Sequence, residues 1–238
     1  MRGMHGFLKS FTSQVVLQRM GAMQPAEGEA MTSPCSPRIS ELLASRICHD
    51  LVGPIGAIGN GVELMTEFGE DMGGDAMKLI ASSAQQATRR LACFRLAYGA
   101  GGADIHVKLA QARDILAAFF EGSHTRLAWD ENVAGLQDGI RQGFPKVVAN
   151  AVLFAAECLN GAGEVEVSRE GSGIIVKASG ERAAFREGAE AALAQKTPPD
   201  ALDVRLIQPF MTGAFALQYG IPLAWQWKDG ALEIRISC

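Results

Sequence analysis

The sequence predicts an α+β fold in which a long antiparallel helical hairpin is followed by an α/β sandwich. Apolar residues recur at three- and four-residue steps over residues 37–68, and again over residues 75–98. A short glycine-containing link joins these two stretches, and the rest of the chain alternates between helical and strand patterns. Hydrophobic residues make up 48% of the 238, which is enough for a sizeable core.

The hairpin is expected to form one domain over residues 36–100. Ser36 can cap the first helix, and Pro37 suits its first helical position. Glycines at positions 99, 101 and 102 are expected to end the second helix. A lone hairpin buries its apolar faces poorly, so we expect a homodimer in which two hairpins form a four-helix bundle.

Residues 101–238 are expected to form a second domain, with one layer of helices on a largely antiparallel sheet. An Asp229-Gly230 pair predicts a tight hairpin turn between the last two strands. The predicted helices cover residues 109–120, 145–159 and 182–195, with a fourth that follows the break at 197–199 and runs to about 219. The predicted strands cover residues 125–129, 164–168, 174–178, 223–228 and 231–237.

Residues 1–35 are expected to be a disordered tail, or an over-extended start with Met31 as the true first residue. Residues 1–20 are mildly basic and amphipathic but lack the compact apolar run of a signal peptide. Residues 21–36 are rich in small residues and read as a linker. No run of about 18 apolar residues predicts a membrane span.

Charge and cysteine content narrow the function classes. The net charge is -4 and the pI about 5.6, which disfavours a general nucleic-acid binder because phosphate contacts need clustered Lys and Arg. The five cysteines include no C-x-x-C pair. Reduced thiols and a cytoplasmic location are therefore expected, rather than a disulfide framework or a zinc site.

His49 is the candidate reactive residue. It lies off the main apolar stripe of its predicted helix, so its ring should be at least partly solvated. The neighbouring Asp50 can orient a neutral imidazole and stabilise its N–H, which makes the ring a good nucleophile. On this pair alone, an ordinary surface histidine is the alternative interpretation.

Residues 46–54 resemble the phosphoacceptor box of sensor histidine kinases, whose pattern is His, acidic, Leu, two variable residues and Pro. His49, Asp50, Leu51 and Pro54 stand at the matching positions. The predicted hairpin is similar to the dimerisation and phosphotransfer domain of those kinases. The α/β sandwich resembles their ATP-binding domain in element order, so the resemblance covers about residues 37–238.

Residues 43–50 and 75–84 together give a more specific resemblance, to alphaproteobacterial histidine phosphotransferases of the ChpT type. This resemblance implies that His49 accepts a phosphoryl group from the receiver domain of a hybrid kinase similar to CckA. Response regulators similar to CtrA and CpdR would then receive it. The chain would hold no cofactor of its own, because the partner receiver supplies Mg²⁺. Asp50 would orient the ring, and Arg46, one turn earlier, can steady phosphate or receiver carboxylates; its alternative role is a solubilising charge.

Three departures from a working kinase argue against ATP binding. Asn150 can match the first Asn of the kinase Asn-x-x-x-Asn motif, but Phe154 stands where the Mg²⁺-binding second Asn should be. Residues 179–183 replace the adenine-reading Asp-x-Gly-x-Gly turn. Only Gly213 remains of the glycine-rich phosphate loop. The second domain is therefore predicted to be a degenerate ATP-binding sandwich. Gly53, four residues after the histidine, lacks the side chain that bifunctional kinases use for dephosphorylation.

The degenerate domain is predicted to have become a receiver-docking surface. Arg182 and Arg186 are four residues apart, so on the predicted helix they share one face. That face can meet an acidic receiver, or it can simply be solvated. The leading function is a phosphoryl shuttle. The alternatives are a noncatalytic pseudokinase adaptor that binds receivers, and a diverged ATP-dependent histidine kinase.

Overall fold

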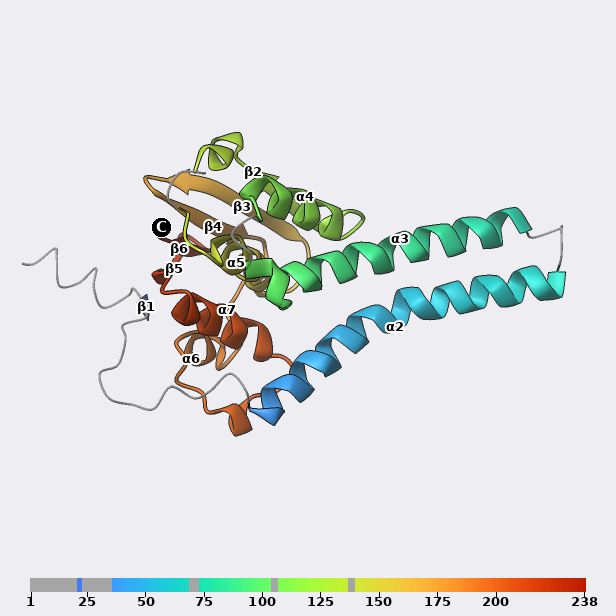
Figure 1. The fold of residues 1–238 in the computed structure, drawn as a ribbon, viewed down its shortest axis with the longest axis horizontal. Helices are drawn as coiled ribbons and strands as arrows, with labels where there is room; N and C mark the ends of the chain where they lie inside the picture. The colour runs from blue at the N-terminus through green and yellow to red at the C-terminus, as the bar shows by residue number, and fades with distance from the viewer. Residues whose placement is uncertain (1–20, 23–35, 69–72, 104–106, 137–139) are drawn as a thin grey trace, which may run out of the picture.

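A computed structural model of the chain describes residues 21–22, 36–68, 73–103, 107–136 and 140–238. A helical hairpin leads into a sheet domain, and the far half of the hairpin projects beyond that domain (Figure 1). The predicted α+β class is confirmed. Most of the predicted tail lies outside the described residues. Gly21 and Ala22, predicted as linker, form the short strand β1.

The hairpin consists of α2 (Pro37–Phe68) and α3 (Gly73–Ala97). Helix α2 continues through Pro54 rather than ending there. The two helices approach each other closely at Gly61, where an added Cβ would lie 2.6 Å from Cγ1 of Ile80. The glycine thus allows Ile80 of α3 to pack directly against the backbone of α2.

The sheet domain follows in the order predicted for most of its elements. Its helices are η2 (Ala100–Ala103), α4 (Leu109–Phe120), η3 (Glu131–Gly135), α5 (Phe144–Cys158), α6 (Ala189–Leu193), η4 (Pro199–Ala201) and α7 (Ile207–Gln218). Its strands are β2 (Thr125–Trp129), β3 (Gly163–Glu170), β4 (Gly173–Ser179), β5 (Leu223–Lys228) and β6 (Ala231–Ile236).

The strands form one sheet in the order β1-β5-β6-β4-β3-β2. Strands β2 and β3 are parallel and every other neighbouring pair is antiparallel, so the expected largely antiparallel sheet is confirmed. Asp229 and Gly230 both have positive φ, at 51° and 75°, as the predicted hairpin turn requires.

Helix α5 forms the centre of the core. It packs against β3, β4 and β6 on one side and against α7 on the other, and almost all of its residues are buried. The apolar residues of β4 alternate, so that Ile174, Val176 and Ala178 face this core.

The predicted helix over residues 182–195 is wrong in its first half. Only Ala189–Leu193 is helical, and Gly188 before it has φ 79°. The preceding segment is drawn onto the core instead. The N–H of Ala184 donates to the carbonyl of Cys158 at 2.8 Å, and the Phe185 ring stacks on Phe154. Tertiary packing here overrides the helix propensity of an alanine-rich run.

The helix predicted after the Pro198-Pro199 break is also shorter than expected. A short 3-10 turn at Pro199–Ala201 comes first, and α7 begins only at Ile207. Among the described residues, no helix combines the length and apolar character needed to cross a membrane.

Candidate functional site

His49 projects from α2 into solvent, with 87% of its side chain exposed. Its Nδ1 lies 3.3 Å from Oδ1 of Asp50, whose side chain is 26% exposed. A carboxylate can only accept a hydrogen bond, so Asp50 favours the tautomer with hydrogen on Nδ1. The Nε2 lone pair then remains free to attack an electrophile.

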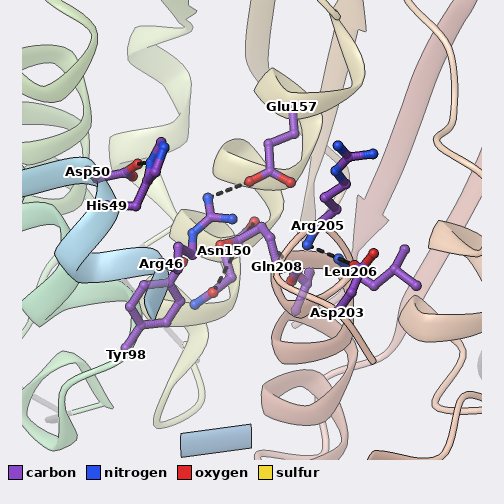
Figure 2. A network of polar contacts seen from close by, with 11 residues as sticks. Arg46, His49, Asp50, Tyr98, Asn150, Glu157, Asp203, Arg205, Leu206 and Gln208 are labelled. Carbon is purple, nitrogen blue, oxygen red and sulfur yellow. Dashed lines mark hydrogen bonds and ion pairs between the residues drawn. The ribbon is translucent and has the colours of Figure 1, made fainter. Parts of the chain in front are cut away.

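Arg46 is not a solvated surface charge. It lies one turn before His49 and pairs with Glu157 near the end of α5 (Figure 2). The two side chains are only 15% and 30% exposed. Burial raises the pKa of the Glu157 carboxyl, and the adjacent guanidinium opposes that rise. Burial also works to lower the pKa of Arg46, but Glu157 raises it overall. The ion pair joins the hairpin to the sheet domain beside the histidine.

A cavity of about 250 Å³ lies beside this ion pair and reaches His49. Two segments far away in sequence complete it, the loop before α6 and the turn before α7. The residues that line the cavity are Arg46, His49, Asp50, Glu157, Arg186, Val204 and Arg205. Glu157 and Arg205 were not identified from the sequence, because no local motif marks residues that reach the histidine only through the fold.

Arg205 is positioned by the turn that opens α7. Oδ1 of Asp203 accepts hydrogen bonds from the backbone N–H of Arg205 at 2.8 Å and of Leu206 at 2.9 Å (Figure 2). This Asx turn fixes the backbone from which the Arg205 side chain extends. Asp203 is a sequence signal for such a turn, though not for the position of the turn beside His49.

Arg182 and Arg186 do not share a helix face, because the helix that would carry both does not form. Arg186 lines the cavity beside His49. Arg182 lies instead over Gly161, where an added Cβ would be 2.3 Å from its Nη2. Its carbonyl accepts a hydrogen bond from Asn160 at 3.3 Å. The structure therefore brings one of the two predicted docking arginines to the histidine.

A buried polar network anchors α3 to α5 and α7. Asn150 donates from Nδ2 to the carbonyl of Ala97 at 2.8 Å, and its Oδ1 accepts from Gln208 at 3.1 Å. Tyr98 donates its hydroxyl hydrogen to Oε1 of Gln208, and Thr212 donates to the carbonyl of Asn150 at 3.2 Å. The network fixes the base of the hairpin relative to the sheet domain (Figure 2).

The residues at the nucleotide-motif positions serve packing. Phe154 is buried and stacks on Phe185 with ring centroids 6.1 Å apart, and Phe185 contacts Trp227 at 5.7 Å. Gly213 lies inside α7, where an added Cβ would be 2.0 Å from the carbonyl oxygen of Leu193. The amide of Asn150 is occupied by the network described above. In the described part of the chain, no three His, Cys, Asp or Glu residues are grouped so as to hold a metal ion.

Comparison with known proteins identifies the family of the chain. Residues 109–231, just over half of the chain, match the family model of the histidine phosphotransferase C-terminal domain. The chain is 29% identical over 191 residues to the protein phosphotransferase ChpT of Brucella abortus (strain 2308), covering 78% of this chain and 88% of that protein. A solved bacterial phosphotransferase shares the fold, with a TM-score of 0.66 at 24% identity, covering 88% of this chain and 98% of that one. The chain therefore belongs to the histidine phosphotransferase family.

Proposed function

We propose that the chain carries phosphoryl groups between the receiver domains of other proteins on Nε2 of His49. One observation carries this proposal: the His49 ring is exposed on α2 while its Nδ1 contacts Asp50. Family membership supplies the reaction class, histidine phosphotransfer. The exposed ring is where a partner protein can reach it.

The transfer balances without any added reactant. The Nε2 lone pair attacks the phosphorus of a receiver aspartyl phosphate, and the bond from phosphorus to the aspartyl oxygen breaks. The carboxylate leaves with the electron pair, and the hydrogen on Nδ1 stays in place. The ring becomes a phosphorylated imidazolium, whose positive charge the Asp50 carboxylate stabilises. A second receiver aspartate reverses these steps and takes the phosphoryl group away.

The Mg²⁺ for this reaction comes with the receiver in the proposal. Phosphoryl transfer depends mainly on positioning and on neutralising charge, so the metal can act from the partner side. Phe154 has no oxygen to offer a hard cation, and the amide of Asn150 is engaged with Ala97 and Gln208. These contacts support a chain that contributes the nucleophile and leaves the metal to its partner.

The proposal also has the chain work without ATP. Phe154 stands where the kinase resemblance would place a Mg²⁺-binding Asn, and it stacks on Phe185, whose ring in turn contacts Trp227. Gly213 packs against α6 rather than forming part of an open loop. A packed aromatic row and a buried glycine leave these positions without phosphate-binding groups. Gly53 offers no side chain to position a water, so hydrolysis of receiver phosphate is secondary.

The proposed partners are a hybrid kinase receiver similar to CckA and response regulators similar to CtrA and CpdR. Docking covers the exposed surface around His49, with Arg186 facing the acidic receiver, while Arg46 stays paired with Glu157. The described cysteines, Cys48, Cys93, Cys158 and Cys238, are all free thiols. Free thiols are compatible with work in the cytoplasm, where such receivers act.

A homodimer is part of the proposal. Ile55 and Val62 of α2 and Met77 and Leu91 of α3 are each between 52% and 56% exposed. On each helix the two positions fall on one face. We refer to these four exposed side chains as the apolar patch of the hairpin, and in the proposal a second hairpin buries them in a four-helix bundle.

Replacing His49 with Gln tests the central claim. A ³²P-labelled phosphorylated receiver is mixed with the chain and Mg²⁺, and base-stable, acid-labile label on the chain is measured. We expect His49→Gln to lose all transfer and to keep its affinity for the receiver. His124→Gln, at another exposed histidine, is the matched control and should transfer normally.

The same assay separates the other functions. Receiver binding with no label on the wild-type chain would establish a noncatalytic adaptor instead. Label that appears on His49 from ATP alone, with no partner present, would establish an ATP-dependent kinase.

A further inference from the structure

The cavity beside His49 brings together several positively charged residues. Three arginines are among the residues that line it, Arg46, Arg186 and Arg205. Arg46 is committed to Glu157. Within the described ranges, neither Arg186 nor Arg205 makes a side-chain ion pair, so both are available to an anion in the cavity.

The charge balance of the cavity changes when His49 is phosphorylated. Asp50 and Glu157 already place two carboxylates in its wall, and a phosphoryl group brings about one to two further negative charges. Arg46 offsets Glu157. The imidazolium charge of the phosphorylated ring offsets Asp50, so the charge of the phosphoryl group itself is left for Arg186 and Arg205 to neutralise.

We propose that Arg186 and Arg205 form a holding site for the phosphoryl group on His49 during the interval between receivers. This proposal rests on the proposed function, because it concerns the phosphorylated form of the same histidine. Each guanidinium presents a planar set of N–H donors that matches phosphate oxygens. The degenerate domain thereby contributes directly to the chemistry of a histidine that belongs to the hairpin.

The dimensions of the cavity are sufficient for a phosphoryl group on His49. At about 250 Å³ the cavity accommodates a phosphoryl group with a few waters, but no element of a partner protein. Receiver carboxylates would approach from the open, solvent side of His49. The two arginines belong to the sheet domain and not to the hairpin that carries His49, so they stay beside the cavity when no receiver is bound.

The supports of both arginines are already in place. Phe185, next to Arg186, is held by stacking on Phe154. The backbone of Arg205 is held by Asp203 through the Asx turn. A site mounted on packed and hydrogen-bonded backbone costs little ordering entropy when its ligand arrives.

The test loads the histidine without any receiver. Potassium phosphoramidate transfers its phosphoryl group to Nε2 as the P–N bond breaks and ammonia leaves. ³¹P NMR then gives two quantities for the phosphorylated chain, the lifetime of the phosphohistidine and the pH at which its phosphoryl group titrates. The variants are Arg186→Gln and Arg205→Gln. Arg113→Gln, an exposed arginine of α4 paired with Asp114, is the matched control.

Loss of either guanidinium should make the phosphoryl dianion less favourable. We expect Arg186→Gln and Arg205→Gln each to raise the phosphoryl pKa by about 0.5–1 unit and to shorten the phosphohistidine lifetime by about three-fold or more. Arg113→Gln should match the wild type. If either cavity variant leaves both quantities at the control value, the holding site as proposed is wrong. Circular dichroism shows separately whether a substitution has altered the folded structure.

A second measurement tests the holding site if phosphoramidate does not phosphorylate His49. Inorganic phosphate is titrated into the unphosphorylated chain while the ring resonances of His49 are followed. They should shift in the wild type and stay unchanged in the double variant Arg186→Gln/Arg205→Gln; equal shifts in both would overturn the site. A chain that accepts a phosphoryl group from phosphoramidate but from no receiver would refute the proposed function. The phosphoramidate measurements would still test the holding site in that case.

Discussion

Two carboxylates beside His49 serve different ends because their neighbours differ. Asp50 keeps a partly exposed oxygen 3.3 Å from the histidine ring. Glu157 is more enclosed and is occupied by Arg46. Removing Arg46 would leave a mostly buried carboxylate without its ion-pair partner, and its pKa would rise further because burial would then be opposed only by the more weakly acting Arg186. The Arg46–Glu157 ion pair therefore favours the ionised form of the Glu157 carboxyl beside His49, and it also joins the hairpin to the sheet domain.

The buried Lys146 makes the stability of the fold depend on pH. Its Nζ donates to the carbonyl of Gly99 at 2.7 Å and lies 4.2 Å from the centroid of the Phe215 ring. Burial lowers its pKa to about 8, whereas an unfolded lysine titrates near 10.4. Between these values the unfolded chain binds more protons than the folded chain, so stability rises with pH.

We expect the wild type to gain stability relative to Lys146→Met as the pH rises. Between pH 7 and 9.5 the relative gain should be about 2 kcal/mol. Urea unfolding of both proteins under reducing conditions measures it, and titrations common to both proteins cancel in the difference. A stability difference that stays constant over this range would show that Lys146 keeps its proton in the fold.

The sequence predicts site residues where the chemistry is local and fails where it is not. His49 and Asp50 are adjacent in one helix, so their pairing follows from the order of residues. Arg205 and Glu157 reach the cavity from turns and helices more than one hundred residues away. No periodicity or motif encodes that approach, because it depends on how α5 and α7 pack beneath the hairpin.

At the scale of elements, α7 depends on a glycine for its packing. Gly213 faces the carbonyl oxygen of Leu193, so α6 and α7 approach too closely for a Cβ between them. Gly-to-Ala inside a helix normally stabilises by about 1 kcal/mol. Here the added methyl group must push the two helices apart, which costs about 1–3 kcal/mol or more.

We expect Gly213→Ala to lower the free energy of unfolding, which reverses the usual sign. Gly56→Ala in α2 is the matched control, since a Cβ there meets no described atom within 4 Å. That control should be neutral or stabilising. Denaturant unfolding of the three proteins distinguishes the cases, and equal effects of both substitutions would contradict the close packing of α6 and α7.

Elements with strong periodicity match their predicted bounds, and those set by tertiary contact do not. Strands β2 and β5 and helix α4 begin and end at the predicted residues. Residues 182–188 carry a helix-favouring composition yet cross the end of α5 as a loop. Phe185 and the N–H of Ala184 gain more from core contacts than a helical turn would offer. Propensity alone gives no measure of that gain.

For the whole molecule, the exposed apolar patch on the hairpin carries the dimer prediction. Ile55→Glu should convert the dimer to a monomer, because a charge replaces an apolar side chain in an interface where two copies meet. Each lost side chain is worth about 2 kcal/mol. Because the substitution is present in both protomers, we expect it to raise the dissociation constant of the dimer by about 1,000-fold.

Sedimentation equilibrium measures this change directly. Leu217→Glu is the matched control, since Leu217 is also exposed but lies on α7, away from the hairpin. It should leave the mass of the particle unaltered. A wild-type chain that sediments as a monomer at micromolar concentration would end the dimer proposal.

The placement of the hairpin relative to the sheet domain was beyond sequence reasoning. It rests on a few side-chain contacts between elements that are distant along the chain. Asn150 is the clearest case. The sequence marks it as a remnant of a kinase motif, whereas the fold uses its amide to hold Ala97 and Gln208.

The buried network of Asn150, Gln208, Tyr98 and Thr212 has a consequence for how a relay behaves. Because it fixes the hairpin to the sheet domain, every arriving receiver meets the same preformed face around His49. Upstream and downstream receivers must then occupy that face in turn, and an unphosphorylated receiver in excess becomes a competitor of the donor. The flow of phosphate through the chain would accordingly peak at intermediate receiver concentrations and fall above them.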